Sequence, residues 1–159
     1  MLEDYKEYAE KDKEVKVGLF YFSGNDVKCA VPVGNFNYNL LKSKVNGLEA
    51  NSNTPHGVSL AYAEREIDKT GYVDKSIVLL TDGMNNIGES PQGIFQSIIK
   101  TNESYGDSKT NLYIIAFNTD PEYFNRLKND GAVVYEAKDG SELSRVLKEN
   151  AELILEKIE

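Results

Sequence analysis

Two stretches of consecutive apolar residues mark the centre of the predicted fold. Residues Ser76 to Thr81 (SIVLLT) and Leu112 to Phe117 (LYIIAF) show no regular alternation between apolar and polar positions. Such runs are typical of strands buried on both faces, as in a parallel sheet that is covered by helices. The first run ends at Asp82 and Gly83, where a polar side chain and a glycine predict a turn out of the sheet.

The amino-terminal part of the chain predicts a β-hairpin. Val15 to Ser23 is rich in β-branched and aromatic residues, and Val27 to Val33 is a second strand-forming run. The residues between the two runs are typical of a tight turn, so we expect the strands to pair antiparallel. Pro32 lacks a backbone N–H, which predicts that the second strand lies at the edge of a sheet.

Helical spacing of apolar residues predicts a helix in nearly every segment that separates these strands. A helix over Phe36 to Val45 would place Leu40, Leu41 and Val45 on one side. The other expected helices cover Leu2 to Lys13, His56 to about Lys69, a segment that begins at Pro91, a segment with Thr119 and Glu122 at capping-box spacing, and a segment from Asp139 to the end. A short last strand is expected over Ala132 to Tyr135. The alternation of strands and helices predicts an α/β fold: a three-layer αβα sandwich around a Rossmann-like, mostly parallel sheet with one antiparallel edge strand.

Composition narrows the function classes. A length of 159 residues predicts one domain that spans residues 1–159. The net charge of −8, with basic residues interleaved among acidic ones, argues against a nucleic-acid partner or an anionic membrane surface. No apolar run approaches the length of a membrane span or of a signal-peptide core, so we expect no membrane insertion. The compartment is left open by the composition, and the single cysteine excludes an intrachain disulfide.

Three polar segments are expected at the carboxyl edge of the sheet: Asn51 to His56, the turn at Asp82, and Asn118 to Asp120. Thr54 supplies a hydroxyl and Asp82 a carboxylate, both oxygen ligands of the kind that Mg²⁺ accepts. Each has a plainer interpretation, because Asp82 would also shape the turn and Thr54 would also cap the helix that follows it. For Asp120 we expect a capping role.

No catalytic pair is recognisable in the sequence. His56 is the single histidine, and we expect it to be a surface residue in the first turn of a helix. No second carboxylate lies beside Asp82 in sequence, and the glycine-rich phosphate-binding loops are absent.

In the order and spacing of several segments, the chain resembles a von Willebrand factor A domain over nearly its whole length. Val17 to Ser23 resembles the second strand of that family, Asn53 to Ala63 its Gly-Gly-Thr loop and following helix, and Ile77 to Gly83 its fourth strand with the Thr-Asp-Gly end. The resemblance implies a metal-ion-dependent adhesion site that binds Mg²⁺ or Mn²⁺ and, through the ion, an acidic side chain of a protein partner. Residue by residue, Thr54 corresponds to the loop threonine of that site and Asp82 to its turn aspartate.

The chain departs from the family pattern at its start. It has no Asp-x-Ser-x-Ser segment and begins within what resembles the first helix, so relative to the family we expect the central first strand to be missing. One threonine and one aspartate cannot fill a shell of about six oxygens, which predicts an incomplete metal site. A gap in the sheet would be closed by direct pairing of the neighbouring strands, by a strand from another copy, or by another part of a longer protein. We expect self-association.

The leading functional hypothesis is a non-enzymatic protein-binding domain whose ligand surface carries Thr54 and Asp82. The alternative is an α/β enzyme or phosphoacceptor that uses Asp82 at a strand end, as receiver domains and haloacid-type phosphatases do. A third interpretation is a structural subunit in which Asp82 only shapes its turn.

Overall fold

The computed structural model describes residues 1–11, 13–49, 53–106 and 108–158. Its elements are α1 (Leu2–Ala9), β1 (Lys16–Ser23), β2 (Asp26–Asn35), α2 (Tyr38–Asn46), α3 (His56–Asp68), β3 (Asp74–Thr81), α4 (Pro91–Tyr105), β4 (Lys109–Phe117), the 3₁₀ helix η1 (Pro121–Phe124), α5 (Asn125–Asn129), β5 (Val133–Ala137) and α6 (Gly140–Lys157). Within the described residues, no helix is both long and apolar enough to cross a membrane.

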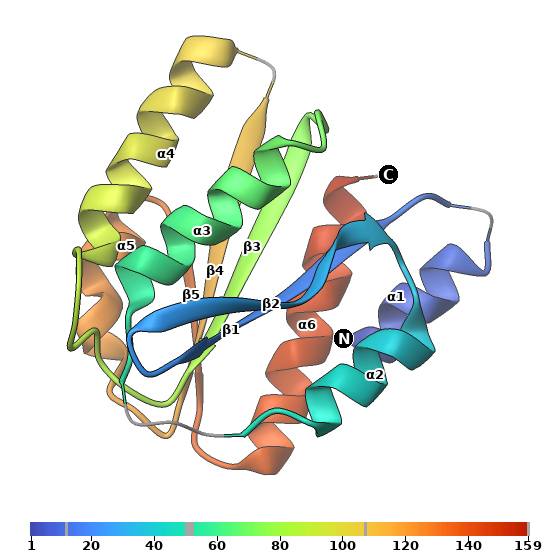
Figure 1. Ribbon diagram of the computed structural model, residues 1–159, viewed down its shortest axis with the longest axis horizontal. Coiled ribbons are helices and arrows are strands. Elements are labelled where there is room, and N and C mark those ends of the chain that lie inside the picture. The colour runs from blue at the N-terminus through green and yellow to red at the C-terminus, as the bar shows by residue number, and fades with distance from the viewer. Residues whose placement is uncertain (12, 50–52, 107, 159) are drawn as a thin grey trace.

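Strands β3, β4 and β5 form a parallel sheet in the order β3-β4-β5. The β3–β4 register runs from Asp74 opposite Lys109 to Thr81 opposite Ala116. Helices α3 and α4 lie on one side of this sheet and α6 on the other (Figure 1). The predicted αβα sandwich is confirmed, and the carboxyl ends of all three strands meet at one edge.

The apolar core has two parts, one on each face of the sheet. The part beneath α3 and α4 includes Leu60, Ile77, Phe95 and Ile114, and the part beneath α6 includes Ile115 and Val146. Because β4 contributes side chains to both parts, it is buried on both faces, as the apolar run at Leu112 to Phe117 predicts.

Strands β1 and β2 form a separate two-stranded antiparallel sheet. The hairpin and its tight turn are confirmed, with Ser23 paired to Asp26 at the tip. Pro32 lies in β2, which in the described part of the chain pairs with β1 alone, as expected for an edge strand. The hairpin packs on α3, where the rings of Phe20 and Tyr62 lie 5.4 Å apart.

Strand β3 differs from the prediction of burial on both faces. Ile77 and Leu79 are 9% and 8% exposed, whereas Leu80, which points to the other face, is 45% exposed. The physical reason is that, among the described residues, β3 pairs with β4 alone, so no neighbouring strand flanks Leu80 on the other side. Within the part of the chain that the structure describes, β1 and β3 are not paired, so direct pairing does not close the predicted gap.

Two predicted helices are present but differ from the prediction in detail. In α2 only Leu41 is buried, at 2% exposed, while Leu40 and Val45 are 41% and 43% exposed. The helix after β4 begins as a 3₁₀ turn, and the expected capping role of Asp120 is confirmed, since its Oδ1 accepts a hydrogen bond from the Glu122 N–H at 2.9 Å; the N-cap is Asp120 and not Thr119. Both sites follow tertiary packing and local turn geometry rather than helical spacing.

Helix α6 carries a buried polar residue that the apolar spacing does not predict. Asn150 is 0% exposed, and neither atom of its side-chain amide has a hydrogen-bond partner among the described residues. A buried amide without partners lowers stability, because it has lost its bonds to water and gained none in return.

We therefore expect Asn150→Leu to raise the free energy of unfolding by about 1–2 kcal/mol, measured by urea denaturation. The matched control is Asn129→Leu, because Asn129 is an exposed asparagine at the end of α5, and the expected change there is below about 0.5 kcal/mol. A loss of stability in Asn150→Leu alone would contradict the assignment of an unpaired amide.

Candidate functional site

The turn after β3 brings the two predicted site residues together. The Thr81 hydroxyl accepts a hydrogen bond from the Gly83 N–H at 3.2 Å, which bends the chain out of the sheet and leaves Asp82 exposed. A β-carbon placed on Gly83 would lie 3.4 Å from the hydroxyl oxygen of Thr54. The Thr54 side chain and the Asp82 turn therefore lie next to each other, although the two residues come from different loops.

Thr54 does not cap α3. The N-cap position is Pro55, and no side chain there bonds to the helix start. Instead, the Thr54 N–H donates to Asn86 Oδ1 at 2.8 Å, and the Asn86 N–H donates back to the Thr54 carbonyl at 3.2 Å. This reciprocal pair holds the Thr54 backbone against the loop that follows the Asp82 turn.

Two asparagines that sequence reasoning missed hold the loops in place. Asn86 clamps the Thr54 backbone, and Asn85 Oδ1 accepts a hydrogen bond from the Gly57 N–H at 3.3 Å. The available signal was their position directly after a Thr-Asp-Gly-Met turn, because asparagine side chains commonly bond to backbone groups of turns. Gly57 itself has no room for a side chain, since a β-carbon there would lie 2.0 Å from the Glu89 carbonyl oxygen.

His56 is buried, and the expectation of a surface residue was wrong. It is 0% exposed, and its ring lies between the rings of Phe22 and Phe124, at centroid distances of 6.2 and 5.9 Å. Its Nε2 is 2.8 Å from the Thr81 hydroxyl oxygen. His56 thus connects the start of α3 to the same hydroxyl that shapes the Asp82 turn, a contact between residues 25 positions apart that local sequence does not reveal.

Burial lowers the pKa of His56 from 6.5 to about 4, because the charged ring would lose its contact with water. The other ring nitrogen, Nδ1, has no hydrogen-bond partner among the residues described. The neutral form is therefore the one that the fold accommodates.

An apolar cavity of about 220 Å³ opens beside Asp82. It is lined by Thr81 and Asp82 together with Phe22, Leu80, Phe117 and Leu143, which come from β1, β3, β4 and α6. The third predicted polar segment also reaches this edge of the sheet, but Asp120 is engaged in capping η1.

Two oxygen-bearing side chains of the predicted metal site lie at this edge of the sheet. Thr54 and Asp82 provide two oxygen ligands, and the described part of the chain contains no group of three or more His, Cys, Asp or Glu side chains that could hold a metal ion. The Asp82 carboxylate is exposed and has no hydrogen-bond or ion-pair partner among the described residues. Two oxygens would fill only part of a six-ligand shell.

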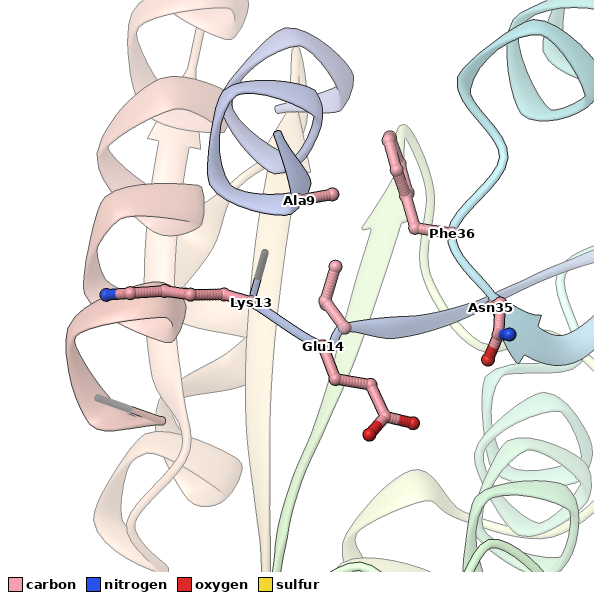
Figure 2. Close-up of a pocket in the computed structure, with 6 residues that line it drawn as sticks. Ala9, Lys13, Glu14, Asn35 and Phe36 are labelled. Atoms are coloured by element: carbon pink, nitrogen blue, oxygen red, sulfur yellow. The ribbon is translucent and has the colours of Figure 1, made fainter. Parts of the chain in front are cut away.

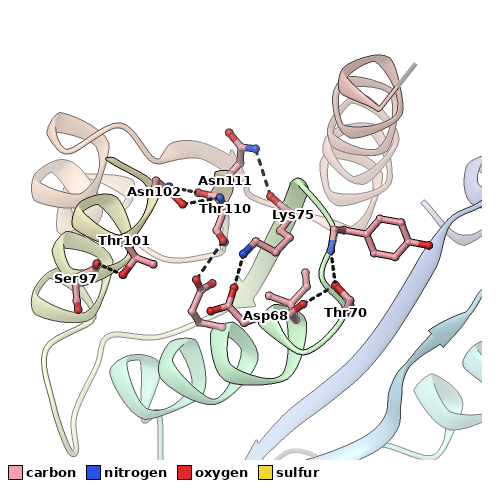
Figure 3. A network of polar contacts seen from close by, with 11 residues as sticks. Asp68, Thr70, Lys75, Ser97, Thr101, Asn102, Thr110 and Asn111 are labelled. Carbon is pink, nitrogen blue, oxygen red and sulfur yellow. Dashed lines mark hydrogen bonds and ion pairs between the residues drawn. The ribbon is translucent and has the colours of Figure 1, made fainter. Parts of the chain in front are cut away.

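A second polar cluster lies at the opposite end of the sheet (Figure 3). Lys75, 7% exposed, forms an ion pair with Asp68, and Thr110 bonds to Glu64 at 3.2 Å. The Asn102 side chain bonds to both backbone groups of Thr110, at 2.9 and 3.1 Å. Burial raises the pKa of Glu64. This cluster ties α3 and α4 to the starts of β3 and β4, and we assign it a structural role.

The low pKa of His56 predicts a loss of stability in acid. As the pH falls from 6.5 to about 4, the unfolded chain takes up a proton at His56 that the folded chain does not, so the free energy of unfolding falls, by on the order of 2 kcal/mol. We expect this part of the pH dependence to be absent in His56→Gln, measured by urea denaturation across the same range.

Glu64 acts with the opposite sign, because its raised pKa favours the folded state at low pH and that contribution is lost as the pH rises. Since Glu64 is present in both proteins, its effect cancels in the comparison. Parallel pH curves for the parent and His56→Gln would contradict the assignment.

Comparison with known proteins agrees with this architecture. The family model of the von Willebrand factor type A domain matches residues 2–149. A solved structure of proximal thread matrix protein 1 from the mussel byssus superposes with a TM-score of 0.73 at 16% identity, over 98% of this chain and 40% of that one. A structure of the same mussel protein with a zinc-occupied MIDAS motif has a TM-score of 0.60 at 19% identity, over 97% of this chain and 42% of that one.

This chain thus spans less than half the length of those two structures, and at such identities their likeness concerns the fold alone. No curated protein sequence matched the chain significantly. The match to the family model covers more than nine tenths of the sequence. The chain belongs to the von Willebrand factor type A domain family.

Proposed function

We propose that this chain is a non-enzymatic protein-binding domain whose binding surface is the carboxyl edge of the sheet around Thr54 and Asp82. We call this surface the Asp82 edge. The observation that carries the proposal is the exposed Asp82 carboxylate, which has no partner among the described residues and lies on a turn beside the Thr54 hydroxyl. A charged group held ready in this way favours recognition of a partner with complementary charge or hydrogen-bonding groups.

The frame behind the Asp82 edge supports the proposal. The buried bond between His56 and Thr81 and the clamp between Asn86 and Thr54 fix the two loops relative to each other. A surface that is already ordered loses little conformational entropy when a partner binds. Family membership supports the same conclusion at the level of a protein-interaction module.

No observation favours the alternative of an enzyme or phosphoacceptor. The groups nearest to Asp82 are hydroxyls, asparagine amides, a buried neutral histidine and an apolar cavity. Aspartate phosphorylation requires further acidic residues around the acceptor, and the described residues place no cluster of three such groups anywhere in the fold.

A second part of the proposal concerns the binding of a divalent cation. Thr54 and Asp82 would supply oxygen ligands to Mg²⁺ or Mn²⁺, and one mussel structure of the same fold is described with zinc in its MIDAS motif. Because two ligands do not complete a site, the binding function proposed here depends on the Asp82 carboxylate itself and not on a bound ion.

The first prediction concerns that cation. In a thermal melt with millimolar Mg²⁺ or Mn²⁺, we expect the Tm of the parent and of Asp82→Ala to change by less than about 1 °C, because an ion that binds weakly adds little to the stability of the folded state. A clear rise in the parent that Asp82→Ala abolishes would contradict this and would mean that further oxygen ligands are recruited.

The second prediction concerns protein binding. The chain serves as bait in a selection from a random peptide display library, and we expect peptides that bind the parent to be enriched. These peptides should bind Asp82→Ala with an affinity at least about tenfold lower, which corresponds to about 1.4 kcal/mol of binding free energy. The matched control is Asp74→Ala, because Asp74 is an exposed aspartate at the other end of β3. Enriched peptides that bind both variants as tightly as they bind the parent would exclude the Asp82 edge.

A further inference from the structure

Three exposed apolar side chains surround the loop that follows Asp82. Met84, Tyr123 and Val58 are 55%, 42% and 38% exposed, and they belong to the β3–α4 loop, η1 and α3. The loop between β3 and α4 passes both the start of α3 and the η1–α5 segment (Figure 1). We call the surface formed by these three residues the Met84 patch. Exposed apolar residues that gather in one place, unlike those that are scattered singly, mark interaction surfaces.

Hydrogen bonds of Asn85 bring the three segments of the Met84 patch together. The Tyr123 hydroxyl donates to the Asn85 carbonyl at 3.5 Å, so Tyr123 lies against the residue that follows Met84. The Asn85 side chain accepts a hydrogen bond from the Gly57 N–H at 3.3 Å, directly before Val58. The three apolar residues therefore lie around Asn85, although they are distant in sequence.

Tyr123 is held in place although its ring is exposed. The ring packs edge-on against the buried ring of Phe124, with a centroid distance of 5.4 Å and an interplanar angle of 90°. A tyrosine fixed in this way adds contact area to an interface at little cost in side-chain entropy, and tyrosines are enriched among the residues that contribute most to binding. The unbranched side chain of Met84 beside it adapts to the shape of a partner.

The charges around the Met84 patch have one sign. Residues 53–58, 82–90 and 118–124, which build this edge, contain no lysine or arginine. Their carboxylates, all on exposed residues, are Asp82, Glu89, Asp120 and Glu122. Among the described residues, none of the four forms an ion pair. Negative charges that no nearby cation neutralises attract a cationic partner and repel an acidic one.

We propose that the Met84 patch and the carboxylates around it bind a segment of a partner protein in which a lysine or arginine lies beside a large apolar side chain. The cationic group pairs with the carboxylates, and the apolar side chain packs on Met84 and Tyr123. This inference rests on the proposed function, because it takes the Asp82 edge as the binding surface and adds the chemistry of the partner.

The same charges argue against two other partners. The resemblance to the family implies an acidic partner that binds through an ion, whereas direct contact with carboxylates requires a cationic one. A second copy of this chain would bring together two net charges of −8. A cationic segment of another protein is therefore the occupant that fits this edge.

Another cavity, at the amino end of β1, lacks this preference for charge (Figure 2). It has a volume of about 220 Å³ and is lined in part by Lys13 and Glu14, whose charges are opposite. Because such a lining favours neither a cationic nor an acidic partner, we assign the charge preference to the Asp82 edge.

The test uses the same peptide display selection, with the parent chain as bait. We expect the enriched peptides to carry a net positive charge and to place leucine, phenylalanine or tyrosine beside lysine or arginine. The measurement is the sequence of the selected pool compared with that of the unselected library. Enrichment of neutral or acidic peptides, or of no peptide at all, would overturn the inference.

Substitutions of the apolar residues test the patch itself. Met84→Ser and Tyr123→Ser should each lower the affinity of the enriched peptides by at least about fivefold, because each removes apolar contact area. The matched control is Tyr105→Ser, since Tyr105 is an exposed tyrosine at the far end of α4, and its affinity should equal that of the parent.

A charge pair tests the carboxylates in the same way. Glu89→Gln should lower the affinity of the enriched peptides, whereas Glu103→Gln should not, because Glu103 is an exposed glutamate of α4 that lies outside the three segments. An equal loss in both variants would indicate attraction to the net charge of the whole chain and would overturn the inference.

The inference and the proposed function can fail separately. An affinity that falls in Asp82→Ala but not in Met84→Ser or Tyr123→Ser would retain the Asp82 edge and overturn the Met84 patch. An affinity that falls in Met84→Ser and Tyr123→Ser but not in Asp82→Ala would support the patch and contradict the proposed role of the Asp82 carboxylate.

Discussion

Among the residues that the structure describes, strand β3 forms ladder hydrogen bonds on one side only, and the arrangement around Asp82 follows from this. Because β4 is its single partner, the far edge of β3 and the side chain of Leu80 stay open. The β1–β2 hairpin is then attached through α3 and through side chains at its ends, as in the contact of Tyr72 with Glu14. An apolar cavity remains beside Asp82, where a paired sheet would be continuous.

The Asp82 edge is held by polar bonds that its neighbours make with one another. The Thr81 hydroxyl serves both the ring of His56 and the backbone of Gly83, and Asn86 serves the backbone of Thr54. With these groups satisfied internally, Asp82 needs no partner to hold its turn. The same bonds explain why a histidine is tolerated inside the core, since one of its nitrogens has a hydroxyl partner and the neutral ring packs between two aromatic rings.

The Asp82 edge presents a solvent-exposed charge, so recognition there should weaken as salt screens it. Family membership describes the scaffold that presents the Asp82 edge.

By itself, the sequence determined the order of the elements, the hairpin, the sandwich and the closeness of Thr54 and Asp82. These follow from local periodicity, turn residues and the rule that parallel strands end at one edge. Only the tertiary structure decided that His56 is buried, that Asn86 clamps Thr54 and that Leu80 is exposed. The burial of His56 and the clamp at Thr54 depend on contacts between segments that are distant in sequence. The exposure of Leu80 depends on which described strands pair with β3, and no local sequence pattern encodes such contacts or pairings.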